Sequence, residues 1–276
     1  MVSDQTTLDY TAPNKNTQII QIDICGTEIG KNYKNTFGLM GDAKSVLEGL
    51  LAKASNKKNS SWVAMVKNLV DDTLERQREL FDSQEHPIQT ARLLKELSDL
   101  LPDDTIVVAD TGWSAVWSAT MLRMKRSQSY IRAAGSLGWS LPASMGAKCA
   151  APGRTVVCFL GDGAFYYHLS ELETAVRYGI NIVVVINNNS RLGQCIPFVQ
   201  EAYINDENKY EDYKRKITFS PVDFVKIAEG LGAEGIRVEN PEEIHTAIRK
   251  ALSIKKPCVV EVLTDCMSRG PLSPSI

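Results

Sequence analysis

The sequence predicts an α/β fold, a doubly wound parallel sheet with helices on both faces. Short apolar runs rich in valine and isoleucine alternate with amphipathic stretches, and the runs end in glycine or in polar residues. Such runs are typical of parallel strands that are buried on both faces. With 43% apolar residues among 276, the chain can also bury one sizeable core.

The elements of this fold lie in residues 86–276, which we interpret as one domain with a C-terminal tail from residue 264. Gly179 and Gly232 follow two of the expected helices and are typical stop signals. Residues 191–217 are polar and aromatic without a clear period, which indicates a lid, a binding loop or a disordered segment. The expected strands are 105–109, 155–160, 181–186, 233–238 and 257–263, and the expected helices are 88–101, 113–124, 168–178, 222–231, 241–253 and one that begins at Pro142.

Residues 1–85 do not make a complete domain. After a polar lead-in, residues 18–24 (QIIQIDI) predict a strand and residues 43–54 an amphipathic helix. One strand and one helix cannot bury a core, so we interpret residues 1–55 as the remnant of another α/β domain. Residues 56–85 then form a linker and a connecting helix.

Composition excludes several classes of function. A formal net charge of −2 leaves no electrostatic footprint for a nucleic acid. The six cysteines and three histidines are scattered without CxxC or HxxxH spacing, which argues against zinc and against a disulfide framework and favours a reducing cytosol. Without a signal peptide or a run of eighteen apolar residues, we expect a soluble cytoplasmic protein with no membrane contact.

Polar residues follow two successive strands of the predicted sheet. Gly161-Asp162-Gly163 follows the strand at 155–160, and Asn189 follows the next one, 27 residues after Asp162. Because a right-handed crossover puts both carboxyl ends on one edge, these residues should meet there. Carboxylate and amide oxygens suit Mg²⁺ or Ca²⁺, and the backbone N–H groups of Gly163, Ala164 and Phe165 suit a phosphate. Gly-Asp-Gly alone is also a common turn, so the second strand and its asparagines decide the interpretation.

This stretch resembles the diphosphate-binding motif of thiamine-diphosphate (ThDP) enzymes, GDG followed after some two dozen residues by NN. The resemblance implies that Asp162, Asn189 and the main-chain carbonyl of Arg191 bind Mg²⁺ beside the cofactor diphosphate. Three consecutive asparagines leave the register open by one residue. We align Asn188-Asn189 with the family pair because residues 190–193 (SRLG) then match a short loop ending in Leu-Gly in the acetolactate synthase group.

A second stretch, YIRAAGSLGWSLPASMGAKCAA at 130–151, has two glycines before a helix of small residues. It resembles the segment beneath the cofactor rings in enzymes of the acetolactate synthase and benzoylformate decarboxylase type. The resemblance implies that Leu137 holds the cofactor in its bent shape and that the carbonyl of Gly135 accepts from the 4′-amino group. With Ser136 and with Gly112, Trp113 and Ser114 near the same edge, these residues, Gly161 to Phe165 and Asn189 form the expected cofactor-binding set.

Trp113, Ser114 and Trp117 are expected at the reacting end of the cofactor. The acetolactate synthase pattern has Gln and His in this segment, so a 2-oxo acid decarboxylase or acyl lyase of the benzoylformate decarboxylase type is an alternative. The leading interpretation is the diphosphate-binding half of an acetolactate synthase-like transferase or lyase. It would act on a 2-oxo acid or related acyl donor by C–C cleavage or decarboxylation with carboligation.

The stretch from Ile19 to Leu51 resembles the end of the central domain in acetolactate-synthase-like enzymes. The resemblance implies that a pyrimidine-binding domain with the activating glutamate belongs to another subunit or a homologous chain, in a homo- or hetero-oligomer. The catalytic residue of this chain stays unknown, and we expect no FAD because the central domain binds it. A non-catalytic ThDP-binding or assembly subunit or a truncated fragment is the alternative from another class. An unrelated nucleotide-binding protein is disfavoured because no GxGxxG or GxxxxGK[ST] motif follows any of the expected strands.

Overall fold

A computed structural model of the chain separates into two compact units, Met1–Leu69 and Val70–Ile276. It describes residues 7, 10–55, 60–133 and 135–268, without the side chains of residues 74 and 76. Most of the predicted lead-in before residue 10, part of the linker (56–59) and part of the tail (269–276) lie outside the described residues. No helix within the described ranges is long and apolar enough to cross a membrane.

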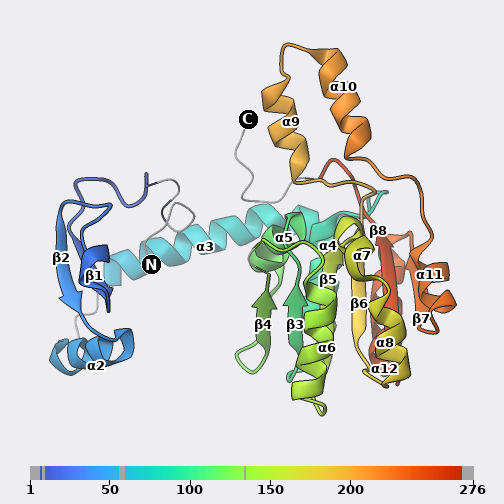
Figure 1. The fold of residues 1–276 in the computed structure, drawn as a ribbon, viewed down its shortest axis with the longest axis horizontal. Helices are drawn as coiled ribbons and strands as arrows, with labels where there is room; N and C mark the ends of the chain where they lie inside the picture. The colour runs from blue at the N-terminus through green and yellow to red at the C-terminus, as the bar shows by residue number, and fades with distance from the viewer. Residues whose placement is uncertain (1–6, 8–9, 56–59, 134, 269–276) are drawn as a thin grey trace. The chain divides into compact units, whose positions relative to one another are not determined.

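The larger unit contains a six-stranded sheet in which all neighbouring strands are parallel, which confirms the predicted sheet (Figure 1). Its strand order is β4-β3-β5-β6-β8-β7. The strands are β3 (Ile106–Ala109), β4 (Ser129–Arg132), β5 (Val156–Gly161), β6 (Val183–Asn188), β7 (Glu234–Val238) and β8 (Cys258–Leu263).

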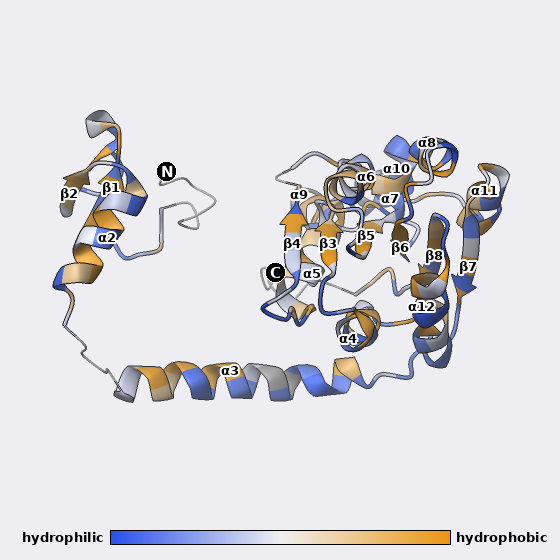
Figure 2. Ribbon diagram, turned by 90° about the horizontal axis from the view of Figure 1, so that it is seen from below, coloured by the Kyte–Doolittle hydropathy of each residue, from blue (hydrophilic) through white to orange (hydrophobic). Residues whose placement is uncertain are grey.

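Helices cover both faces of this sheet, as predicted (Figure 2). One face packs against α4 (Thr90–Leu100), α5 (Trp113–Met121) and α12 (Ile244–Ser253), which follows the 3-10 turn η2 (Pro241–Glu243). The other face packs against α6 (Ser140–Ala150), α7 (Asp162–His168), α8 (Glu171–Arg177) and α11 (Phe224–Gly230).

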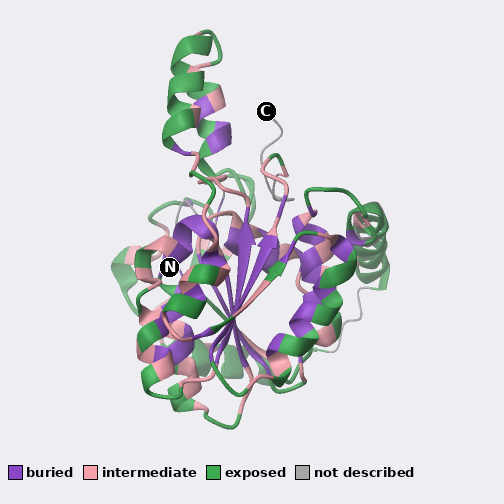
Figure 3. Ribbon diagram, turned by 90° about the vertical axis from the view of Figure 1, so that its right-hand side faces the viewer, coloured by how far each residue is buried: buried purple, intermediate pink, exposed green. Residues whose placement is uncertain are grey.

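The two hydrophobic layers explain why the strands read as continuous apolar runs. In β5, Val157 and Phe159 join one buried cluster, whereas Cys158 and Leu160 join the other. Alternate side chains of a strand point to opposite faces, so a strand covered by helices on both sides needs apolar residues at every position. Figure 3 shows the buried strands at the centre of the unit.

Residues 191–217 do not form the irregular segment that the sequence suggested. They contain two helices, α9 (Cys195–Ala202) and α10 (Glu207–Lys216), which form a hairpin at the carboxyl edge of the sheet (Figure 3). Helix α10 has no buried residue and is supported by ion pairs at helical spacing, such as Lys214–Glu211 and Lys216–Asp212. Because its polar residues surround the helix, no apolar period marks it in the sequence.

The Gly-Asp-Gly segment is not a separate turn before a distant helix. Strand β5 passes directly into α7, whose first residue is Asp162, and α8 follows from Glu171. The helix predicted at 168–178 corresponds to α8, but α7 was missed, because the small residues of the motif are themselves the first turn of a helix. An acidic residue is favourable in that first turn.

The smaller unit contains a parallel pair of strands, β1 (Ile19–Asp23) and β2 (Thr36–Met40), with the short 3-10 turn η1 (Gly26–Glu28) between them. Helix α2 (Ala43–Lys53) follows, and Asp42 caps it by accepting from the Ser45 N–H at 3.0 Å. Helix α3 (Ser60–Phe81) continues the chain across the boundary between the units. The sequence predicted β1, α2 and the helical segment but not β2.

The core of the larger unit supplies a stability test. Phe224 is 1% exposed and packs edge-on against Phe165 with ring centroids 5.3 Å apart. We expect Phe224→Ala to lower the free energy of unfolding by about 3–5 kcal/mol, since it leaves a cavity and removes an aromatic pair. Phe198→Ala is the matched control, because Phe198 is 67% exposed. Equal losses in the two variants, measured by denaturant unfolding, would show that this core is wrongly assigned.

Candidate functional site

The connections of the sheet reverse direction between β3 and β5. From β3 the chain crosses over α5 to β4 on one side, and from β5 it crosses over α7 and α8 to β6 on the other. In open α/β sheets such a reversal leaves a crevice outside the carboxyl ends of the two strands, where ligands bind. The fold alone therefore points to the segments that follow β3 and β5.

A cavity of about 390 Å³ lies at this edge. Segments that follow four different strands line it, so residues far apart in the sequence meet there. The lining residues are Thr111, Gly112, Trp113, Ser114, Gly135, Leu137, Gly161, Asp162, Gly163, Ala164, Asn187, Asn189, Arg191, Leu192, Gly193, Gln194 and Cys195.

Two side-chain oxygens converge on one backbone N–H in this cavity. The Arg191 N–H donates to Oδ2 of Asp162 at 3.0 Å and to Oδ1 of Asn189 at 3.2 Å. The register of β5 and β6, in which Gly161 pairs with Asn187, brings the two segments to this meeting. A carboxylate oxygen and an amide oxygen are thus held beside each other, which is a donor set that hard cations prefer.

The carboxylate of Asp162 is almost fully buried, with 2% of the residue exposed. Burial raises the pKa of Asp162 from its ordinary value of 3.8 to about 7, against hydrogen bonds from the backbone of Gly163, Arg191 and Ser190 that lower it. Because the Gly163 N–H donates to Oδ1 of Asp162 at 2.8 Å, this N–H is already used within the motif. Binding of a phosphate by the N–H groups of Gly163, Ala164 and Phe165 stays a prediction.

The three asparagines at the end of β6 have three different environments. The Oδ1 of Asn187 accepts from the Thr90 hydroxyl at 3.1 Å. Asn188 is buried, and its Nδ2 donates to Glu261 at 2.7 Å. Asn187 and Asn189 both line the cavity, but it is Asn189 that shares the Arg191 N–H donor with Asp162. This arrangement supports the register in which Asn189 is the ligand.

A second buried carboxylate holds the loop that carries Leu137. Asp110, at the end of β3, is 0% exposed and accepts backbone N–H bonds from Thr111 (2.9 Å), Gly138 (3.0 Å) and Ser140 (2.8 Å). These bonds hold the loop that carries Leu137 against β3. The sequence placed Asp110 at a strand end but gave no signal that it would bind a loop some 30 residues away.

Gly138 is required by close packing in this loop. Its φ is +89°, and a Cβ there would lie 2.5 Å from Cβ of Tyr167 and 3.1 Å from the carbonyl oxygen of Ala164. The carbonyl oxygen of Gly138 lies 3.0 Å from Nδ1 of His168. The loop therefore packs directly on α7 and cannot accept a larger residue without moving.

The structure brings most of the predicted residues together. Gly135 and Leu137 join Gly112, Trp113, Ser114, Gly161, Asp162, Gly163, Ala164, Asn189 and Arg191 in the cavity wall. Ser136 is exposed and does not line the cavity, and Phe165 turns its ring into the core, where it is 0% exposed.

The structure corrects the position predicted for Trp117. It is 3% exposed and lies in the core cluster between the sheet and α4, so the prediction that it faces the reacting end of a cofactor was wrong. Trp113 and Trp117 are four residues apart and therefore lie on the same face of α5. Trp113 nevertheless reaches the cavity, because it is the first residue of the helix. The cavity residues from Leu192 to Cys195 were missed because they lie in the segment interpreted as irregular.

Comparison with known proteins bears on the chemistry of this cavity. Residues 110–262 match the family described as thiamine pyrophosphate enzyme, C-terminal TPP binding domain. The chain belongs to the thiamine pyrophosphate enzyme family. The matched range begins at Asp110, directly after β3, and ends in β8, so it includes all the described residues that line the cavity.

Several curated members of this family are similar to the chain. A probable acetolactate synthase large subunit from Methanococcus aeolicus is 29% identical over 99% of this chain and 47% of its own length. One from Methanocaldococcus jannaschii is 30% identical, with 99% and 46% covered. Glyoxylate carboligase from Escherichia coli O157:H7 is 32% identical, with 93% and 45% covered. The chain therefore spans about half the length of the curated relatives it matches.

The buried Asp162 carboxylate predicts a pH-dependent cost to the cofactor-free chain. The pKa of Asp162 is about 7 in the folded chain and has its ordinary value of 3.8 in the unfolded chain, so the carboxyl group ionises at a lower pH in the unfolded chain. The wild type therefore loses stability as the pH rises from 4 to 8. Relative to Asp162→Asn, we expect its free energy of unfolding to fall by on the order of 1–4 kcal/mol over that range. Urea titrations in chelator-treated buffer measure this difference. A difference that does not change with pH would contradict the assignment.

Proposed function

We propose that this chain binds thiamine diphosphate through Mg²⁺ at the carboxyl edge of its sheet and acts as part of an acetolactate synthase-like enzyme. The convergence of Asp162 and Asn189 on the Arg191 N–H carries the proposal, because it sets two oxygen donors beside each other in a cavity of about 390 Å³. The match to the thiamine pyrophosphate family supports the cofactor.

The residues present fit the metal. Oδ of Asp162, Oδ1 of Asn189 and the main-chain carbonyl of Arg191 would hold Mg²⁺, and the diphosphate oxygens would complete its shell. The pKa of Asp162 is raised because burial disfavours its ionised carboxylate. A divalent cation would reverse that preference and keep the carboxylate ionised.

The rest of the cavity fits the organic part of the cofactor. Leu137 lies on the wall formed by the Asp110-bound loop, with Trp113 and Ser114 on the wall that follows β3. Leu137 would support the bent cofactor, and the carbonyl of Gly135 would accept from its 4′-amino group. When bound, thiamine diphosphate supplies the stabilisation of a carbanion formed at an acyl carbon.

The substrate we propose is a 2-oxo acid or a related acyl donor, with C–C cleavage or decarboxylation followed by carboligation. The names of the relatives, acetolactate synthase and glyoxylate carboligase, support this class. Trp113 lines the cavity where the acetolactate synthase pattern has a polar side chain. A decarboxylase or acyl lyase is therefore the alternative within the class.

A second chain would complete the site. Asp162 is the one carboxylate among the described residues that line the cavity, and its oxygens are assigned to the metal. We therefore propose that the glutamate that activates the cofactor comes from a pyrimidine-binding domain on another chain, in an oligomer. Cofactor binding without turnover in the presence of such a partner would favour the alternative, a ThDP-binding or assembly subunit without catalysis.

Calorimetric titration of thiamine diphosphate tests the proposed site. We expect binding to the wild type that needs Mg²⁺ and is weakened at least about 100-fold in Asp162→Ala and in Asn189→Ala, because each removes one metal ligand. Asp42→Ala is the control, since Asp42 only caps α2 in the smaller unit. Binding that does not depend on Mg²⁺, or that survives both ligand substitutions, would refute the proposed metal site.

A further inference from the structure

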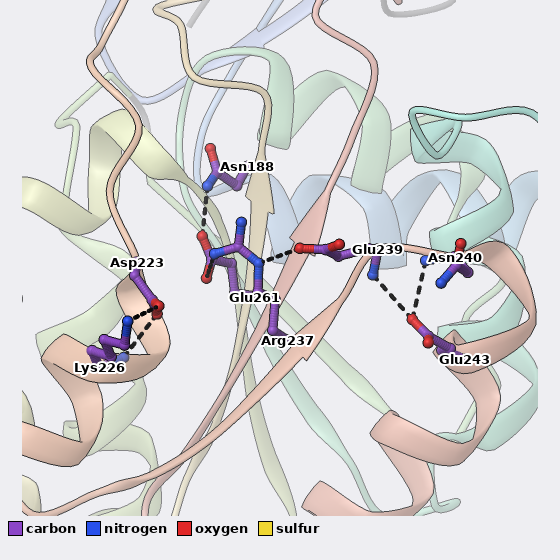
Figure 4. Close-up of polar contacts among 8 residues, drawn as sticks. All are labelled: Asn188, Asp223, Lys226, Arg237, Glu239, Asn240, Glu243 and Glu261. Atoms are coloured by element: carbon purple, nitrogen blue, oxygen red, sulfur yellow. Dashed lines mark hydrogen bonds and ion pairs between the residues drawn. The ribbon is translucent and has the colours of Figure 1, made fainter.

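A buried glutamate lies beside the asparagine run. Glu261, in β8, is 0% exposed within a strand that is otherwise apolar. One of its oxygens accepts from Nδ2 of Asn188 at 2.7 Å, and the other accepts from the guanidinium of Arg237 at 3.3 Å (Figure 4). The three side chains come from the adjacent strands β6, β8 and β7.

Burying the carboxylate of Glu261 in the core costs free energy. Burial raises the pKa of Glu261, and the nearby Asp223 adds to that effect, whereas the hydrogen bond from Asn188 and the charge of Arg237 lower the pKa. Arg237 is itself partly exposed and also pairs with Glu239 (Figure 4). A buried ion pair of this kind contributes little net stability compared with an apolar side chain. The contact that an apolar residue could not supply is the acceptor for Asn188.

Glu261 fixes which way the amide of Asn188 points. With Nδ2 directed at Glu261, Oδ1 of Asn188 accepts from the Ser190 N–H at 3.0 Å. Ser190 has a φ of +55°, a left-handed conformation that residues other than glycine seldom adopt. If the amide were reversed, its NH₂ group would face the Ser190 N–H, and two donors cannot bond each other. The glutamate therefore selects the amide orientation that supports the turn.

The turn at Ser190 fixes the position of Arg191. Immediately after Ser190, the Arg191 N–H reaches Asp162 and Asn189 together, at 3.0 and 3.2 Å. Hydrogen bonds thus link Glu261 in β8 to Asn188 and Asn188 to Ser190, and the peptide bond from Ser190 to Arg191 connects them to the two candidate metal ligands. Partners behind the direct ligands commonly fix ligand orientation in metal sites.

We propose that Glu261 is a positioning residue for the candidate Mg²⁺ site, acting through the amide of Asn188 on the turn from Asn189 to Arg191. The metal part of this inference rests on the proposed function. The positioning of the turn itself is a property of the cofactor-free chain and can be tested without any ligand.

The test compares Glu261→Met with Glu261→Gln. Glutamine keeps an oxygen acceptor for Asn188, whereas methionine fills a similar volume without one. Glu96→Met is the matched control, because Glu96 is also a buried glutamate with an arginine partner, at 2.9 Å from Arg92, but lies on α4 away from the turn. Two readouts are used: amide hydrogen exchange at Ser190 and Arg191 in the cofactor-free chain, and Mg²⁺ affinity at a fixed concentration of thiamine diphosphate.

In Glu261→Met we expect at least about tenfold faster exchange at both amides and at least about tenfold weaker Mg²⁺ binding. Glu261→Gln should stay within about threefold of the wild type in both readouts, and Glu96→Met should match the wild type at these amides. If Glu261→Met does not fold, Asn188→Ala removes the same link from the other side and should give the same acceleration.

Unchanged exchange at Ser190 and Arg191 in a folded Glu261→Met would overturn the inference. So would equal acceleration in Glu96→Met, which would reveal general destabilisation instead of positioning. Absence of Mg²⁺-dependent binding in the wild type would overturn the proposed function, and the exchange comparison would still decide whether Glu261 positions the turn.

Discussion

The reversal of strand order between β3 and β5 is the constraint on which the candidate site depends. Because the chain leaves these neighbouring strands in opposite directions, their carboxyl ends cannot be covered by the crossover helices. The backbone there is left to form loops and helix starts around a cavity. Segments from residue 111 to residue 195 reach one place as a consequence of this topology.

The site is held by buried carboxylates that the core would not otherwise need. Asp110 accepts from one backbone N–H in its own loop and from two in the neighbouring loop. Asp162 accepts from the Gly163 and Arg191 N–H groups, and Glu261 orients Asn188. Buried charges cost stability unless they are hydrogen-bonded, and here each is bonded to a segment of the cavity wall. Stability is thus exchanged for a fixed arrangement of loops.

Much of this fold follows from the sequence because the strands are buried on both faces and read as apolar runs. The same reasoning missed β4 (SYIR), which is short and has a polar residue at each end, and β2 (TFGLM), in which a glycine interrupts the apolar residues. It also missed α10, whose stability comes from ion pairs along its surface. The positions of Asp162 and Asn189 could be predicted because parallel strands align their ends. The hydrogen bonds of Asp110 and Glu261 could not, since they join segments whose separation in sequence carries no pattern.

A crystal structure of the chain with thiamine diphosphate and Mn²⁺, with the metal located by anomalous scattering, tests the central claim most directly. We expect one strong peak at about 2.0–2.3 Å from an oxygen of Asp162, Oδ1 of Asn189 and the carbonyl oxygen of Arg191, with diphosphate oxygens completing the shell. A metal bound elsewhere, or bound through the side chain of Asn187 or Asn188, would contradict both the proposed ligands and the role of Glu261.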